Sequence, residues 1–152
     1  MKTLLISGIY RPEIGGPATY IPALATEIQS QNVSVEVVTL KNSTASEINE
    51  PWPITYINRD QFLMIRFFKT YLRIRSRVKS SDFVLANGLF QETAIALLFS
   101  GKRSIAKVVG DPVWERAFNL SETSLDIEEF NIEFARPVDD VLPVLNSTLY
   151  DV

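Results

Sequence analysis

With 152 residues the chain is long enough for one domain with a substantial hydrophobic core, and a mean hydropathy of +0.08 is typical of a globular protein. It contains no cysteine and no histidine, which excludes thiol chemistry, disulfides, the usual zinc sites and a histidine base, so a catalytic base is expected to be a carboxylate. The net charge of −3 is unevenly distributed, because residues 1–110 contain 13 Lys and Arg against 8 Asp and Glu, whereas residues 111–152 contain 2 against 10.

The chain begins with a short apolar run, followed by a loop that contains two adjacent glycines. Residues 4–6 are too few for a helix and predict a strand buried on both faces. Gly15 and Gly16 lack a Cβ, so a bulky ligand can touch the backbone there. Pro17 suits the first turn of a helix, whose free N–H groups favour an anion. The loop therefore predicts either a phosphate site or simply a tight turn between a strand and a helix.

Three further elements follow in the first half of the chain. Apolar residues at helical spacing predict a helix over residues 17–30, with Pro22 either in its first turn or at a kink. Runs rich in β-branched residues predict strands over residues 33–40 and 54–57, separated by a polar loop that closes with two prolines.

The most amphipathic segment covers residues 62–78 and predicts a helix. Its basic edge consists of Arg66, Lys69, Arg73 and Arg77. Its apolar side consists of Leu63, Met64, Phe67, Phe68, Tyr71, Ile74 and Val78. Either the basic edge contacts an anionic membrane surface, or the apolar side packs on a sheet and the basic side chains are solvated. The acidic pI and the lack of aromatic residues along the basic edge argue against nucleic acid as a partner.

The alternation of short strands and helices continues to about residue 109. We predict a strand over residues 83–86, a buried helix over residues 89–100 that ends at Gly101, and a strand over residues 105–109. This alternation is typical of a parallel sheet with helices on both faces. The predicted fold class is therefore α/β, a Rossmann-like three-layer arrangement around a parallel sheet.

Unusual residues follow three of the predicted strands. They are Gly15 with Gly16, Asn87 with Gly88, and Gly110 with Asp111. Because ligands bind open α/β sheets beyond the carboxyl ends of the strands, we expect these residues to form one site. The chain has no GxGxxG after the first strand, no acid after the second and no GK[ST] motif, which argues against a nicotinamide enzyme or an ATPase.

Three segments, SGIYRPEIGGPATY, SDFVLANGL and KVVGDPVWERA, occur in this order. Together they resemble the amino-terminal domain of the family-four retaining glycosyltransferases, from residue 1 to about residue 130. The resemblance implies one half of a GT-B fold, in which the first domain binds the acceptor and the second holds the nucleotide sugar. It also implies retaining, metal-independent transfer of a hexose from a nucleotide sugar, without a further cofactor, to a glycan or lipid-linked acceptor in polysaccharide biosynthesis.

The resemblance assigns roles to individual residues. Gly15 and Gly16 would line the donor side of the cleft. The residues that would face the acceptor and the transferred sugar are Asn87, Gly88, Gly110 and Asp111. Many members of the family have histidines after the fourth and fifth strands, whereas this chain has Asn87 and Gly110 there. Asp111 is then the nearest ionisable group and the expected catalytic residue.

Two alternatives remain open around this segment. Asp111 either orients an acceptor hydroxyl or the donor sugar, or it caps a helix that starts at Pro112. Trp114, Glu115 and Arg116 either line the acceptor pocket or form an ordinary helix surface with an intrahelical ion pair.

We expect residues 1–130 to form the acceptor domain and residues 131–152 an irregular acidic tail. The family's second domain, with its paired glutamates, is not part of these 152 residues, so we expect a truncated product, a fragment or one subunit of a split enzyme, inactive without a donor-domain chain. The alternative is a non-catalytic α/β binding module or a remnant. Because signal-peptide and membrane-span patterns are absent, we expect a cytoplasmic protein, peripheral at the inner face of the cytoplasmic membrane if the basic helix edge binds lipid.

Overall fold

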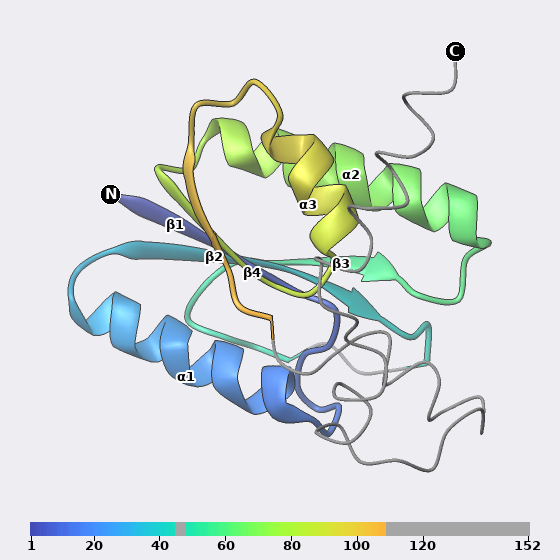
Figure 1. Ribbon diagram of the computed structural model, residues 1–152. Helices are drawn as coiled ribbons and strands as arrows, with labels where there is room; N and C mark the ends of the chain where they lie inside the picture. The colour runs from blue at the N-terminus through green and yellow to red at the C-terminus, as the bar shows by residue number, and fades with distance from the viewer. Residues whose placement is uncertain (45–47, 109–152) are drawn as a thin grey trace, which may run out of the picture. The chain divides into compact units, whose positions relative to one another are not determined.

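The computed structural model describes residues 1–44 and 48–108, which contain one parallel sheet with the strand order β3-β2-β1-β4-β5 (Figure 1). The strands are β1 (Lys2–Ser7), β2 (Ser34–Lys41), β3 (Ile54–Asn58), β4 (Phe83–Asn87) and β5 (Arg103–Ala106). The helices are α1 (Gly16–Ser30), α2 (Leu63–Lys79) and α3 (Phe90–Leu97). The predicted α/β fold is confirmed.

Helices cover both faces of the sheet, which gives three layers. Figure 1 shows α1 on one face and α2 with α3 on the other. Successive side chains of a strand point to opposite faces, so Leu5 packs with Ile21 of α1, whereas Leu4 and Ile6 pack with Ile74 of α2. All three β1 side chains are 0% exposed. The prediction that this first strand is buried on both faces is confirmed.

The order of the strands reverses next to β1. Helix α1 connects β1 to β2 on one side, whereas β4, which follows α2, pairs with β1 on its other side. The loops that leave β1 and β4 therefore start from neighbouring strands and run to opposite faces of the sheet. Such a reversal is the topological switch point, where open α/β sheets form a crevice for ligands.

Helix α2 matches the predicted helix over residues 62–78, but its apolar side is covered along only part of its length. The side chains that it adds to the core come from its second half, Tyr71, Ile74 and Val78. Six apolar side chains are exposed, five of them just before the helix or in its first half and Leu72 just past its middle, namely Phe62, Leu63, Met64, Ile65, Phe68 and Leu72. The expectation that this whole side packs on the sheet is therefore wrong for the first half. In the described part of the chain, no helix has the length and apolar character needed to cross a membrane.

Helix α3 is shorter and less buried than the predicted helix over residues 89–100. It ends at Leu97, and of its side chains only Thr93 and Ala96 are buried. Arg75 of α2 contacts this end of the helix, because its Nη1 donates to the carbonyls of Ala96 (2.7 Å) and Leu98 (3.0 Å). These bonds satisfy carbonyls that a further helical turn would otherwise engage.

Strand β5 also differs from the prediction of residues 105–109. Its register with β4 pairs Arg103 with Phe83 and Ala106 with Ala86, so it begins and ends earlier. All four of its residues are exposed. The apolar residues on which the prediction rested therefore did not mark where this strand begins and ends. Residues 1–108 form one compact unit. The predicted boundary at residue 130 and the acidic tail lie outside the described residues.

Candidate functional site at the switch point

The carboxyl ends of β1 and β4 touch through their glycines. Ser7 is in register with Asn87, and the chain continues from these residues into Gly8 and Gly88. A Cβ on Gly88 would lie 2.7 Å from the backbone nitrogen of Gly8, and the φ of Gly88 is 132°. Residues with a side chain rarely adopt this φ, so glycine is required where the two strand ends meet.

Helix α1 starts at the same edge of the sheet. Gly15 occupies the N-cap position with a φ of 155°, and no side chain caps the helix. A Cβ on Gly16 would have no neighbour within 4 Å, so the backbone here faces open space. Pro17 has no N–H to offer, and the N–H of Thr19 already donates to the carbonyl of Gly15 (3.2 Å). The helix start thus has the uncapped N–H of Gly16 and the positive end of the helix dipole available for an anion.

The loop between β1 and α1 is held in place by Arg59, which directly follows β3. Its Nη2 donates to the carbonyl of Gly8 (2.7 Å), and its Nη1 forms an ion pair with Oε2 of Glu13 (2.6 Å). Arg66 of α2 in turn donates from Nη1 to the carbonyl of Arg59 (3.1 Å). The end of β3 is therefore tied directly to this loop, and α2 is tied to it through Arg59.

A second set of contacts fixes the middle of this loop. Tyr10 is 1% exposed, and its hydroxyl accepts from Nε1 of Trp52 (3.1 Å) and donates to Oε1 of Glu50 (3.3 Å). The guanidinium of Arg11 binds both carboxylate oxygens of Glu50, each at 2.5 Å. Burial is the main cause that raises the pKa of Tyr10 to about 12, so the phenol is neutral at physiological pH. The loop is thus preorganised, which lowers the entropy cost of binding a ligand.

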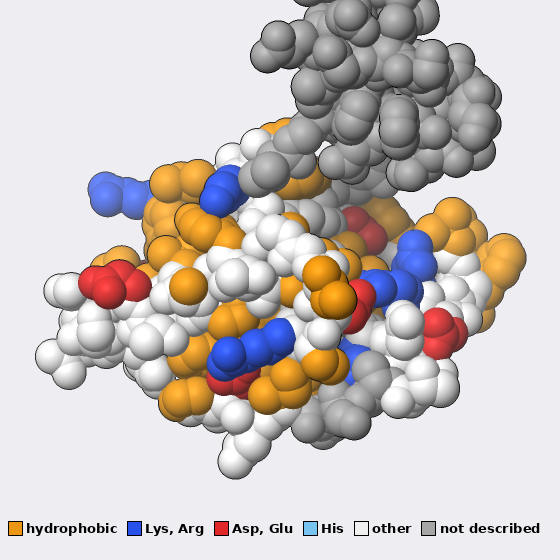
Figure 2. Space-filling view, turned by 90° about the horizontal axis from the view of Figure 1, so that it is seen from below, with side chains coloured by type: hydrophobic (Ala, Val, Ile, Leu, Met, Phe, Trp, Pro, Cys, Tyr) orange, Lys and Arg blue, Asp and Glu red, His pale blue; other side chains and the backbone are white. Residues whose placement is uncertain are grey.

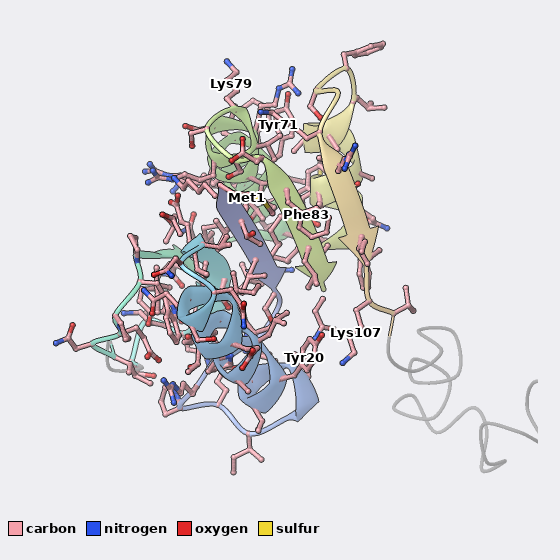
Figure 3. All side chains as sticks on the ribbon, turned by 90° about the vertical axis from the view of Figure 1, so that its left-hand side faces the viewer. Met1, Tyr20, Tyr71, Lys79, Phe83 and Lys107 are labelled. Carbon is pink, nitrogen blue, oxygen red and sulfur yellow. The ribbon has the colours of Figure 1, made fainter. Side chains whose placement is uncertain are left out.

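The positively charged side chain of Lys107 directly follows β5, at the same carboxyl edge of the sheet. The Nζ of Lys107 lies 3.2 Å from the centroid of the Tyr20 ring. Figure 3 shows the two side chains meeting beyond the ends of β4 and β5. Asn87, the last residue of β4, is only 6% exposed. The edge therefore combines a helix start, an amide side chain and a positive charge.

The structure describes some of the predicted site residues and not others. It brings Gly15, Gly16, Asn87 and Gly88 to one edge of the sheet. Outside the described residues lie Gly110, Asp111, Trp114, Glu115 and Arg116. Sequence reasoning missed Arg59 and Lys107. The signal that could have found them is their position directly after a strand.

The four residues of the predicted basic edge of α2 have different surroundings. Arg66 braces the loop as described above, and Nε of Arg77 pairs with Oε1 of Glu36 (2.9 Å), whose side chain is 3% exposed. Lys69 and Arg73 form no ion pair or hydrogen bond with another residue in the described ranges, and both are exposed. Two of the four are therefore structural, and two are available for a ligand.

Other parts of the surface are less distinctive. On the side that α1 covers, basic and acidic side chains are interspersed with apolar ones (Figure 2). Within residues 1–44 and 48–108, no group of three or more His, Cys, Asp or Glu side chains could hold a metal ion. The chemistry that the switch point itself offers is recognition of an anionic, hydrogen-bonding ligand.

Comparisons with known proteins add little to this picture. The chain matches no model of a known protein family and no curated protein. Among solved structures it is similar to the C-terminal domain of a hydrogenase from Pyrococcus furiosus, with a TM-score of 0.48 and 13% sequence identity over 70% of this chain and 91% of that domain. A similarity of this size supports no argument about activity. The fold defines an α/β protein with a three-layer, Rossmann-like arrangement, in which an uncapped helix start lies at the switch point of the sheet.

Proposed function

We propose that this chain is the acceptor-binding half of a glycosyltransferase, which transfers a hexose from a nucleotide sugar to a glycan or lipid-linked acceptor in polysaccharide biosynthesis. The observation that carries the proposal is the switch point, where the uncapped start of α1 and the joined ends of β1 and β4 lie at one edge. Open α/β sheets bind ligands at this position. The resemblance of the loop sequences to the family-four retaining glycosyltransferases suggests the substrate class.

Each part of the edge has a role under this proposal. The backbone at Gly15 and Gly16 approaches the donor diphosphate, which the helix dipole of α1 attracts. Lys107 adds a positive charge beside the leaving group. Asn87 and Gly88 face the acceptor and the transferred sugar.

The proposed reaction is a retaining substitution at the anomeric carbon. The bond from this carbon to the diphosphate oxygen breaks, a bond to the acceptor oxygen forms on the same face, and the hydroxyl proton passes to the departing phosphate. We assign Asp111 to orienting the acceptor hydroxyl and Gly110, Trp114, Glu115 and Arg116 to the acceptor pocket, all outside the described residues. The nucleotide sugar is a co-substrate, and no cofactor is assigned.

The proposal requires a second, donor-binding domain, either elsewhere in a longer protein or on a separate chain. We also place the protein in the cytoplasm, peripheral at the inner face of the membrane, where a lipid-linked acceptor would be met. Support comes from the start of α2, where Ile65 is 52% exposed one helical turn before Lys69, and Phe62, directly before the helix, is 72% exposed. Exposed apolar side chains beside cations suit the interface of an anionic bilayer.

The binding step can be tested by titrating the full chain with UDP-glucose and GDP-mannose while recording amide NMR spectra. We expect the shifts to centre on Gly15, Gly16, Asn87 and Gly88. Gly16→Ala places a methyl group in open space, so the fold should persist while ligand approach is obstructed and affinity falls roughly tenfold. Gly101→Ala, at the opposite edge of the sheet, adds a methyl group at a φ of 64°, which costs about 1–2 kcal/mol of stability but should leave the affinity unchanged.

Two results would count against the enzyme. If neither nucleotide sugar shifts these amides when a donor-binding domain is also present, the switch point is not a donor site. If the chain binds glycans but supports no hexosyl transfer when mixed with a donor-binding domain, the alternative of a non-catalytic binding module is favoured.

A further inference from the structure

A cavity of about 540 Å³ lies between the edge strand β3 and the face of α2 that points away from the core. Its main lining residues are Tyr56, Asn58, Gln61, Lys69, Leu72 and Arg73. The volume is within the range of about 300–1,000 Å³ that is typical of small-molecule sites. Because β3 is separated from β1 and β4 by β2, this cavity is distinct from the switch point.

The cavity is positively charged. Lys69 and Arg73 lie one helical turn apart, so both side chains reach the same space, and none of the lining residues is acidic. The other arginines of α2 are engaged: Arg75 caps α3, and Arg77 pairs with Glu36. Lys69 and Arg73 have no such partner in the described part of the chain. Two adjacent cations without an acid favour a phosphate group, either a dianionic monoester or a monoanionic diester.

Two residues that line the cavity each contain a buried polar atom without a partner. The hydroxyl oxygen of Tyr56 and Oε1 of Gln61 are buried and form no hydrogen bond, and they are two of the four such side-chain atoms found in the described ranges. An unsatisfied buried polar group costs about 1–3 kcal/mol, so a native fold rarely keeps two in one place without a ligand or water. The Tyr56 hydroxyl can donate or accept, whereas the Gln61 oxygen requires a donor such as a ligand hydroxyl.

We propose that this cavity binds a phosphorylated polyol. The phosphate lies between Lys69 and Arg73. A small rotation of the Tyr56 and Gln61 side chains toward the cavity lets the Tyr56 hydroxyl donate to a phosphate oxygen and Gln61 accept from a polyol hydroxyl. The same chemistry occurs in a soluble sugar or glycerol phosphate and in a phospholipid headgroup with free hydroxyls. Leu72, which is 48% exposed and lines the cavity, is compatible with either source.

The experiment is a titration of the full chain with sn-glycerol 3-phosphate, with glycerol as the uncharged control, followed by amide NMR spectra. We expect shifts at Tyr56, Gln61, Lys69 and Arg73. Lys69→Gln should weaken binding roughly tenfold, and Tyr56→Phe, which removes only the hydroxyl, by roughly threefold to tenfold.

The matched control is Lys79→Gln, which removes the same charge from an exposed position at the far end of α2 (Figure 3). It should leave the affinity unchanged. If it weakens binding as much as Lys69→Gln does, the ligand responds only to overall charge, and the proposal fails.

A second arm distinguishes the two sources by vesicle flotation with phosphatidylglycerol and with phosphatidylcholine. One outcome identifies a lipid headgroup: phosphatidylglycerol vesicles capture the chain, phosphatidylcholine vesicles do not, Lys69→Gln abolishes the capture, and soluble glycerol 3-phosphate gives no response. A response to the soluble compound without vesicle capture identifies a metabolite. The proposal is overturned if the chain neither responds to soluble glycerol 3-phosphate nor is captured by phosphatidylglycerol vesicles. Because the reporting amides lie on β3 and α2, this outcome leaves the nucleotide-sugar test at Gly15 and Asn87 unaffected.

Discussion

The backbone of Gly88 lies so close to that of Gly8 that no side chain fits between them. Gly88→Ala would bring a methyl carbon within 2.7 Å of a backbone nitrogen, at a φ of 132°. The strain and the overlap together should destabilise the protein by about 2–5 kcal/mol. Gly16→Ala, which meets nothing within 4 Å, should change stability by at most about 1 kcal/mol. Urea unfolding of both variants measures the difference, and equal midpoints would show that the strand ends are not in contact.

Tyr10 gives the protein a defined response to alkaline pH. Its pKa is raised to about 12 in the folded state, mainly by burial, against an ordinary value of 10.0. A raised pKa in the folded state contributes stability below pH 10, which is lost as the pH rises towards 12, because the unfolded chain loses the proton first. The loss should be about 2–3 kcal/mol.

The check for Tyr10 compares urea unfolding of the wild-type protein and Tyr10→Phe at about pH 9 and pH 12. The variant lacks the ionisable hydroxyl, so its stability should fall less over this interval than that of the wild type. Because lysines titrate in both proteins, only the difference between the two slopes is informative. Identical slopes would mean that the Tyr10 phenol is accessible to water.

The residues of the switch point were predictable to different degrees. Gly15, Gly16, Asn87 and Gly88 follow short apolar runs, and the carboxyl ends of parallel strands share an edge by geometry, so their convergence follows from local patterns. The contact of Arg59 with the Gly8 carbonyl depends on the pairing of β3 with β2, which no local pattern specifies.

Among the elements, α2 shows most clearly what periodicity can and cannot predict. The 3.6-residue repeat located the helix and its apolar side. It did not show that the core would take up Ile74 and Val78 while Met64 and Phe68 stayed exposed, because coverage depends on where the helix crosses the sheet. The same limit applies to α3, whose end is contacted by Arg75 from another helix.

Two isoleucines of α2 make this difference measurable. Ile74 is 0% exposed, whereas Ile65 is 52% exposed. Ile74→Ala should cost about 2–5 kcal/mol through lost burial and a residual cavity. Ile65→Ala should change stability by less than about 0.5 kcal/mol, because it removes little buried surface and alanine favours the helix. Chemical denaturation tests both, and a large loss for Ile65→Ala would show that a further part of the chain covers this face.

Across the whole sheet, burial declines from the centre to one edge. β1 pairs on both sides and contributes Leu4, Leu5 and Ile6 to cores on both faces. β5 lies at the edge of the described sheet, and all four of its residues are exposed. A strand with few buried contacts opens locally at a low cost in free energy. We therefore expect β5 to open while β1 stays closed.

Native-state hydrogen exchange of the full chain should therefore separate the strands. We expect the amides of Leu4–Ile6 in β1 to exchange only through global unfolding, with a free energy that falls with added denaturant as steeply as the unfolding transition itself. The amides of β5 should exchange through local opening that costs at least about 2 kcal/mol less and depends little on denaturant. Equal protection in β1 and β5 would mean that β5 is covered in solution by residues outside the described ranges or by a partner. In either case the sheet edge beside Lys107 would be covered, and access to the switch point from the β5 side would depend on what covers it.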